Sequence, residues 1–143
     1  MSQTRKLSIA LFIIRVSAAA FLGVWASLKF YRPEWMVNVF RNVYKLDFIT
    51  QDYAVAIGTV QMLIVFLFLI GFQRTIFYGL TALMHSAGVI GSIPSLLFKF
   101  TIYPSNLLWS AVPTLGALIA LFILREHDQF TIDGWRKNQK KTL

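Results

Sequence analysis

The chain contains no cysteine among its 143 residues. Without a thiol it forms no disulfide, ligates no metal through a thiolate and has neither a cysteine nucleophile nor a Cys-x-x-Cys redox motif. Charged residues are also scarce, at 14% of the chain, whereas about 25% is usual for a soluble domain. If the protein takes part in redox chemistry, no thiol of this chain carries it.

Acidic residues and histidines are few, and their positions exclude several kinds of site. The six acids all lie outside the long apolar runs: Glu34, Asp47, Asp52, Glu126, Asp128 and Asp133. Of the two histidines, His127 follows the last run, which argues against a bis-histidine haem or a metal cluster with His85. The P-loop, Gly-x-Gly-x-x-Gly, His-Glu-x-x-His and serine-triad signatures are missing as well. The sequence therefore predicts no metal site, no catalytic residues and no stand-alone enzyme.

Long apolar runs are what the chain does have, and hydrophobic residues make up 57% of it. Each run is about 20 residues long, enough to cross a bilayer as a helix. The predicted spans are residues 7–28, 53–72, 76–97 and 107–124. The first is too long for a signal-peptide core, so we expect it to be retained. The sequence predicts a single all-α integral-membrane domain over residues 1–143, an antiparallel bundle of four transmembrane helices.

The segment between the first two spans is polar and aromatic. Pro33 and Glu34 favour a helix start, and apolar residues then recur at helical spacing. This pattern predicts a short amphipathic surface helix, which either caps the bundle or binds a partner. The residues predicted to anchor the chain at interfaces are Trp25, Lys29, Trp35, Phe40 and Trp109.

The basic residues predict the orientation. Eight lie on the side of the termini and of the 73–75 turn, and five lie on the other side. The positive-inside rule then places both termini in the cytoplasm, and we expect a bacterial inner membrane. The net charge of +8 suits anionic lipid headgroups rather than nucleic acid. The basic tail, residues 125–143, is expected to be a frayed, solvated helix or a disordered arm.

Three polar residues inside the spans lie at similar depth. At about 1.5 Å per residue, Arg15 and His85 are each about 13 Å from the cytoplasmic edge, and Gln61 is about 12 Å from the opposite one. An antiparallel bundle is able to bring them together near the midplane. We therefore predict a ligand site at Arg15, Gln61, His85 and the adjacent Ser86.

Each of these residues also has a structural interpretation. Because no span contains an acid, Arg15 has no carboxylate partner there. We expect it to contact a quinone carbonyl or small anion, to bond backbone carbonyls, or to extend to the membrane surface. His85 beside Ser86 is alternatively a hydrogen-bonded packing residue. Gln61 is alternatively a bridge between helices.

Two stretches resemble the DoxX-like family of small membrane proteins. The stretch Arg15–Lys29, RVSAAAFLGVWASLK, is similar to the first-span motif, and Ile57–Gly88 is similar to the second and third spans. The family commonly has a glutamate near the position of Gln61, so the amide weakens any inference of proton coupling. The resemblance implies a four-helix membrane protein. Some members of the family are linked to thiosulfate:quinone oxidoreduction or serve as accessory subunits of redox systems, and many have no known role.

The sequence thus favours a membrane subunit or accessory protein of a quinone-linked redox system, with a quinone or a small anion as the expected ligand. Its expected partners are the lipid bilayer and either a redox subunit or a second copy of the chain. One alternative is a small-solute transporter or channel, for which the spans lack an acidic coupling residue. Another is a scaffold or assembly factor acting through the 31–52 segment or the basic tail.

Overall fold

The computed structural model describes residues 2–103 and 105–139, and this part of the chain is helical apart from its turns and connections. The α-helices and the two short 3₁₀ helices (η) follow in the order α1 Gln3–Tyr31, α2 Pro33–Asn42, α3 Gln51–Leu69, α4 Arg74–Phe98, η1 Ser105–Ser110, α5 Ala111–Ile123, η2 Arg125–His127 and α6 Ile132–Gln139.

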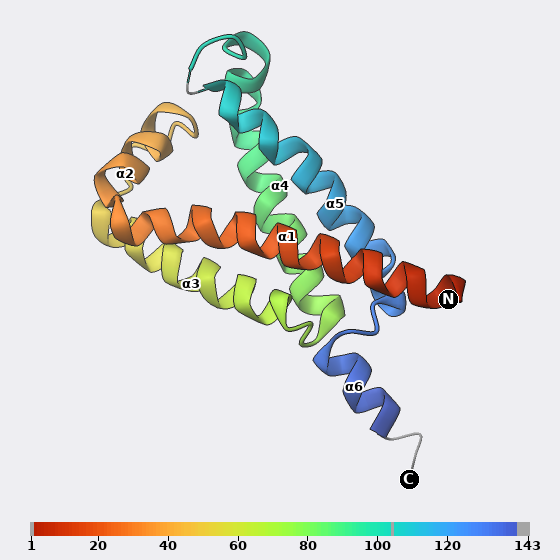
Figure 1. Cartoon of the computed structure of the whole chain (residues 1–143). Coiled ribbons are helices and arrows are strands. Elements are labelled where there is room, and N and C mark those ends of the chain that lie inside the picture. The colour runs from red at the N-terminus through yellow and green to blue at the C-terminus, as the bar shows by residue number, and fades with distance from the viewer. Residues whose placement is uncertain (1, 104, 140–143) are drawn as a thin grey trace.

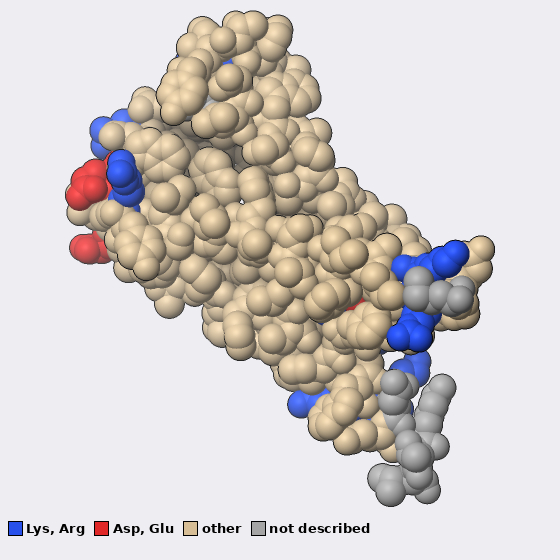
Figure 2. All heavy atoms as spheres, in the orientation of Figure 1, with Lys and Arg blue, Asp and Glu red and all other residues tan. Residues whose placement is uncertain are grey.

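Four helical stretches are long and apolar enough to cross a membrane, which confirms the four predicted runs. They are α1, α3, α4 and the continuous stretch Ser105–Ile123, made of η1 and α5. The largest difference lies in the last run, which begins with a 3₁₀ segment rather than an α-helix. Figure 2 shows charged side chains gathered at two ends of the molecule, with a broad uncharged band between them.

The long helices form two neighbouring pairs. Helix α1 lies along α3, and α4 lies along α5, with α4 also contacting α3 (Figure 1). The short α2 lies where α1 ends and α3 begins, while the N-terminus and α6 lie at the opposite end of α1 (Figure 1). We call these the α2 end and the termini end.

One face of α1 is buried along the helix and reaches from the termini end to the α2 end. Its buried residues recur every three or four positions: Ser8, Leu11, Arg15, Ala18, Ala19, Leu22, Ala26 and Lys29. The alanines are small enough to let α3 approach closely. Arg15 and Lys29 therefore share a face, separated by 14 residues or about 21 Å of helix.

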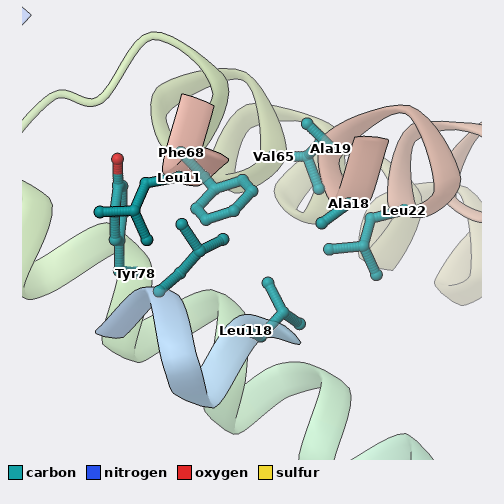
Figure 3. Packing of buried hydrophobic residues seen from close by; sticks show 9 residues of the cluster. Leu11, Ala18, Ala19, Leu22, Val65, Phe68, Tyr78 and Leu118 are labelled. Atoms are coloured by element: carbon teal, nitrogen blue, oxygen red, sulfur yellow. The ribbon is translucent and has the colours of Figure 1, made fainter. Parts of the chain in front are cut away.

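The core lies between these two charges. Ala18, Ala19 and Leu22 pack with Val65 of α3 and Leu118 of α5 (Figure 3). Nearer the termini end the rings of Phe68 and Tyr78 meet edge to face, with centroids 5.1 Å apart. Arg15 and Lys29 thus belong to two separate polar regions.

The expected surface helix is present as α2. Its N-terminal Pro33 supplies the fixed backbone angle that suits a helix start. Met36 is buried, whereas the Trp35 ring packs on Trp25 of α1 with centroids 6.1 Å apart. The helix therefore packs against the end of α1.

The prediction of a frayed, solvated helix or a disordered arm is wrong for residues 125–134, which pack against the bundle, whereas residues 135–139 do continue a helix, with exposed side chains at residues 135–137 and 139. Asp128 is fully buried and Thr131 is 6% exposed. The Ile132 amide donates to the Ile70 carbonyl at 3.1 Å, and Ser8 of α1 donates to the His127 carbonyl at 2.7 Å. The segment Asp128–Gly134, here called the return segment, is therefore held between α1 and the turn at residues 70–73. The predicted tail residues Lys140 and Lys141 lie outside the described residues.

Asp133 of the return segment caps helix α4. Its carboxylate accepts from the amides of Gln73 and Arg74, at 3.1 and 2.8 Å. Gln73 itself has a left-handed backbone and provides no side-chain cap. A carboxylate at this position satisfies free amides and opposes the positive end of the helix dipole.

Replacing Asp133 by alanine is expected to lower the free energy of unfolding by about 1 kcal/mol, the usual cost of a lost cap. Thermal unfolding in detergent measures this loss. The matched control is Asp47→Ala, because Asp47 forms only an exposed ion pair with Arg41. Equal stability of the two variants would contradict the capping role.

Candidate functional site

Arg15 lies in a closed polar cluster at the termini end. Its guanidinium donates to the Tyr78 hydroxyl at 2.9 Å, to the Asp128 carboxylate at 2.5 Å and to the Phe130 carbonyl. The Tyr78 hydroxyl in turn donates to the same carboxylate oxygen at 2.7 Å. We call Arg15, Tyr78 and Asp128 the arginine cluster.

The expectation that Arg15 lacks a carboxylate partner is therefore wrong. Asp128 follows the last span in sequence, but the return segment carries it back against α1 as a buried counter-ion. Arg15 is 1% exposed and Asp128 0%. The charge of Arg15 is therefore balanced inside the fold, although its Nε and the Oδ1 atom of Asp128 are buried without a hydrogen-bond partner among the described residues.

Arg74 holds the return segment in place. Its guanidinium donates to the carbonyls of Arg125 and Asp128, both at 2.7 Å. Its Nε also lies 3.8 Å from the Asp133 carboxylate. The basic turn between α3 and α4 thus binds the return segment from one side, while Arg15 binds it from the other.

An open cavity of about 470 Å³ lies at the α2 end. It is bordered by α1, α2, the loop after α2, α3, α4, η1 and the start of α5. Most of its wall is apolar or aromatic, including Phe21, Trp25 and Leu108. Its polar lining residues are Lys29, Tyr44, Gln61, His85, Ser92 and Ser110. Apolar walls with a few polar groups are typical of small-molecule sites.

The His85 side chain of α4 is held in place by a contact with α5. Its Nε2 lies 2.9 Å from the Ala111 carbonyl. Because a carbonyl only accepts, Nε2 carries the proton in this contact, and Nδ1 of the neutral ring is then an acceptor. Phe21 of α1 holds the imidazole from the side, edge to face at 6.1 Å.

Tyr44 and Gln61 add polar groups from two further directions. Tyr44 packs so closely on α4 that a Cβ at Gly91 would lie 2.7 Å from its ring, so glycine is needed there. Burial raises the pKa of the Tyr44 phenol, which therefore stays protonated and able to donate at neutral pH. The half-buried Gln61 offers both an amide donor and a carbonyl acceptor.

The structure therefore places the predicted site residues in different surroundings. Gln61 and His85 line the same cavity, but Arg15 does not. Ser86 is absent from the lining as well, and its hydroxyl donates to the Ala82 carbonyl of its own helix.

The predicted anchor residues also differ in whether they line the cavity. Lys29, Trp25 and Phe40 line the cavity, whereas Trp35 does not. Trp109 donates to the Leu96 carbonyl at 3.2 Å and joins η1 to α4. The polar lining residues that were not predicted for the ligand site are Lys29, Tyr44, Ser92 and Ser110.

Comparison with protein-family models, curated proteins and solved structures finds no match to this chain. Within residues 2–103 and 105–139, no three His, Cys, Asp or Glu side chains are grouped so that they could hold a metal ion. The chemistry of the cavity therefore has to follow from its own side chains.

Proposed function

We propose that the protein is a small subunit or accessory protein of a quinone-linked redox system that binds a quinone headgroup in the cavity. The observation that carries this proposal is the combination of apolar walls with Lys29, Gln61 and His85 in one open space. A quinone presents a flat apolar ring with carbonyl acceptors. The side chains of Lys29, Gln61 and Tyr44 are donors that match those carbonyls.

The proposal places the chain in a bacterial inner membrane as an antiparallel bundle of four spans with cytoplasmic termini. The uncharged band between two charged ends supports a transmembrane orientation (Figure 2). Arg74 donates to the Asp128 carbonyl, so the 73–75 turn and the return segment lie at the same end. The basic residues of this end favour the cytoplasmic side. The cavity then opens in the opposite half of the membrane.

A transporter or channel is less well supported by the packing. A solute path would have to pass from the cavity to the termini end through the core around Leu22, Val65 and Leu118. No acidic residue lines the cavity to couple transport to an ion gradient. The resemblance of Arg15–Lys29 to DoxX-like proteins also agrees better with an accessory redox role.

Replacing Gln61 by leucine is expected to weaken quinone binding about tenfold, because it removes an amide donor to a quinone carbonyl. His85→Leu is expected to weaken binding as well, because it breaks the contact with the Ala111 carbonyl that fixes this wall of the cavity. Titration of the purified protein with 1,4-naphthoquinone measures the affinity. Quenching of tryptophan fluorescence reports it, since Trp25 lines the cavity.

Ser86→Ala is the matched control, because Ser86 adjoins His85 in sequence but does not line the cavity. This variant is expected to bind like the unmodified protein. Unchanged affinity in both leucine variants, with the fold intact, would contradict the proposed quinone site.

A further inference from the structure

Lys29 is a buried cation that the fold does not neutralise. Its side chain lines the cavity, and the residue is only 5% exposed. The ammonium has three donors, but the hydrogen bond found for it is a long one, 3.4 Å to the Trp25 carbonyl one turn earlier. None of the four ion pairs among the described residues includes Lys29.

The acidic residues of the chain are placed elsewhere. Asp128 and Asp133 pair with arginines at the termini end, and Glu126 pairs with Arg125 there. Asp47 pairs with Arg41 at the surface. Glu34 and Asp52 are exposed and do not line the cavity. Among the described residues, the cavity therefore has a cation and no carboxylate.

The surrounding contacts keep Lys29 at the cavity. A Cβ at Gly58 of α3 would lie 2.8 Å from the Lys29 Cβ and 3.2 Å from its Cδ, so the lysine stem packs directly against α3. The neighbouring polar groups do not compensate the charge. Tyr44 stays neutral because burial raises its pKa, and Gln61 is an uncharged amide. A charge taken out of water in this way needs a partner.

We infer that the ligand of the cavity carries a negative charge on its headgroup, which the Lys29 ammonium neutralises. This inference rests on the proposed quinone site and makes it more specific. The ligand class is a quinone with an ionised hydroxyl group on its ring, rather than a neutral quinone. Lys29 binds the ionised oxygen, and the aromatic and aliphatic wall contacts the ring.

The test compares two ligands of the same ring and similar size. 2-Hydroxy-1,4-naphthoquinone is a vinylogous carboxylic acid that is ionised at neutral pH, whereas its 2-methoxy analogue has no ionisable group. Both are titrated into the full chain in nanodiscs of neutral lipid. We expect the unmodified protein to bind the hydroxy compound about tenfold or more tightly than the methoxy compound, because only the former makes a charge-assisted contact.

The variant Lys29→Met removes the charge and keeps an unbranched apolar stem. It is expected to lose this preference by weakening the hydroxy compound alone, while Lys99→Met, an exposed lysine outside the cavity, keeps it. The visible spectrum of the bound hydroxy compound gives a second measurement. In the unmodified protein its ionisation is expected to move to lower pH, because the ammonium stabilises the anion.

The experiment distinguishes a failure of the proposed quinone function from a failure of the inferred anionic headgroup. If neither compound binds, the proposed quinone function is wrong. If both bind equally tightly and Lys29→Met affects both alike, the quinone site survives and the anionic headgroup is excluded. If anionic lipid in the nanodiscs abolishes binding of both compounds, a lipid headgroup is the partner of Lys29, and the inference of an ionised quinone is overturned.

Discussion

Replacing Asp128 by asparagine is expected to lower the free energy of unfolding by about 3–5 kcal/mol, the usual cost of leaving one charge of a buried pair without its partner. Asp128 is the counter-ion of Arg15, and both residues are almost completely inaccessible to solvent. The substitution keeps the shape of the side chain and removes its charge. Chemical or thermal unfolding in detergent measures the loss.

Two controls distinguish the cost of the unpaired buried charge from a general loss of stability in the return segment. In the double variant Arg15→Met with Asp128→Leu, both charges are absent, and most of the lost stability is expected to return. The exposed pair Arg41–Asp47 provides the comparison, since Asp47→Asn is expected to cost less than about 1 kcal/mol. If Asp128→Asn is no more costly than Asp47→Asn, the arginine cluster does not hold the termini end together.

Replacing Gly71 by alanine is the second change with a large expected effect, a loss of about 2 kcal/mol or more. Gly71 has a φ of +66°, which strains any residue with a Cβ. The new Cβ would also lie 2.5 Å from the Thr131 Cβ and 3.2 Å from Nη1 of Arg15. The substitution therefore strains the turn and displaces the return segment together.

Gly23→Ala provides the matched control for this substitution. Gly23 lies inside α1, and a Cβ there meets no neighbouring atom within 4 Å. Alanine is a better helix former than glycine, so this variant is expected to be as stable as the unmodified protein, or more stable by up to about 1 kcal/mol. Equal stability of Gly71→Ala and Gly23→Ala would contradict the close approach of the return segment to the turn.

The helices were predictable because hydrophobicity and local turn chemistry determine them. Runs of about 20 apolar residues indicate spans whatever their neighbours are. The proline at position 33, followed by an amphipathic pattern, similarly indicated α2. The start of the last helix was less predictable, because a 3₁₀ segment and an α-helix have similar composition.

The site was only partly predictable, because residue counts along a helix give depth but not direction. Arg15 and His85 were expected at the same depth, yet Arg15 contacts Tyr78 and the return segment, while His85 contacts α5. The direction of a side chain around its helix depends on which helices pack beside it. The spacing of Arg15, the alanines and Lys29 on one face of α1 was a usable signal that Lys29 is buried.

The partner of Arg15 could not be found from local patterns. Asp128 is 113 residues away, in a stretch whose charges indicated a solvated tail. The apolar residues Phe130, Ile132 and Trp135 within this stretch were the available signal that it packs against something. Which helix it meets depends on tertiary contacts such as those of Arg74.

The two polar regions of the protein differ in how their charges are balanced. At the termini end Arg15 has a carboxylate of the same chain, so its charge is balanced without a ligand. At the α2 end Lys29 has no such partner and lines an open cavity. This difference is the reason for placing the ligand site beside Lys29 rather than beside Arg15.

The most direct measurement of this central claim is an anomalous difference map from crystals grown with a bromine-bearing 2-hydroxy-1,4-naphthoquinone. The expected result is a bromine peak inside the cavity, with a ring oxygen within hydrogen-bonding distance of the Lys29 ammonium. A ligand bound beside Arg15 with the return segment displaced, or a cavity without bromine at saturating ligand, would contradict the claim.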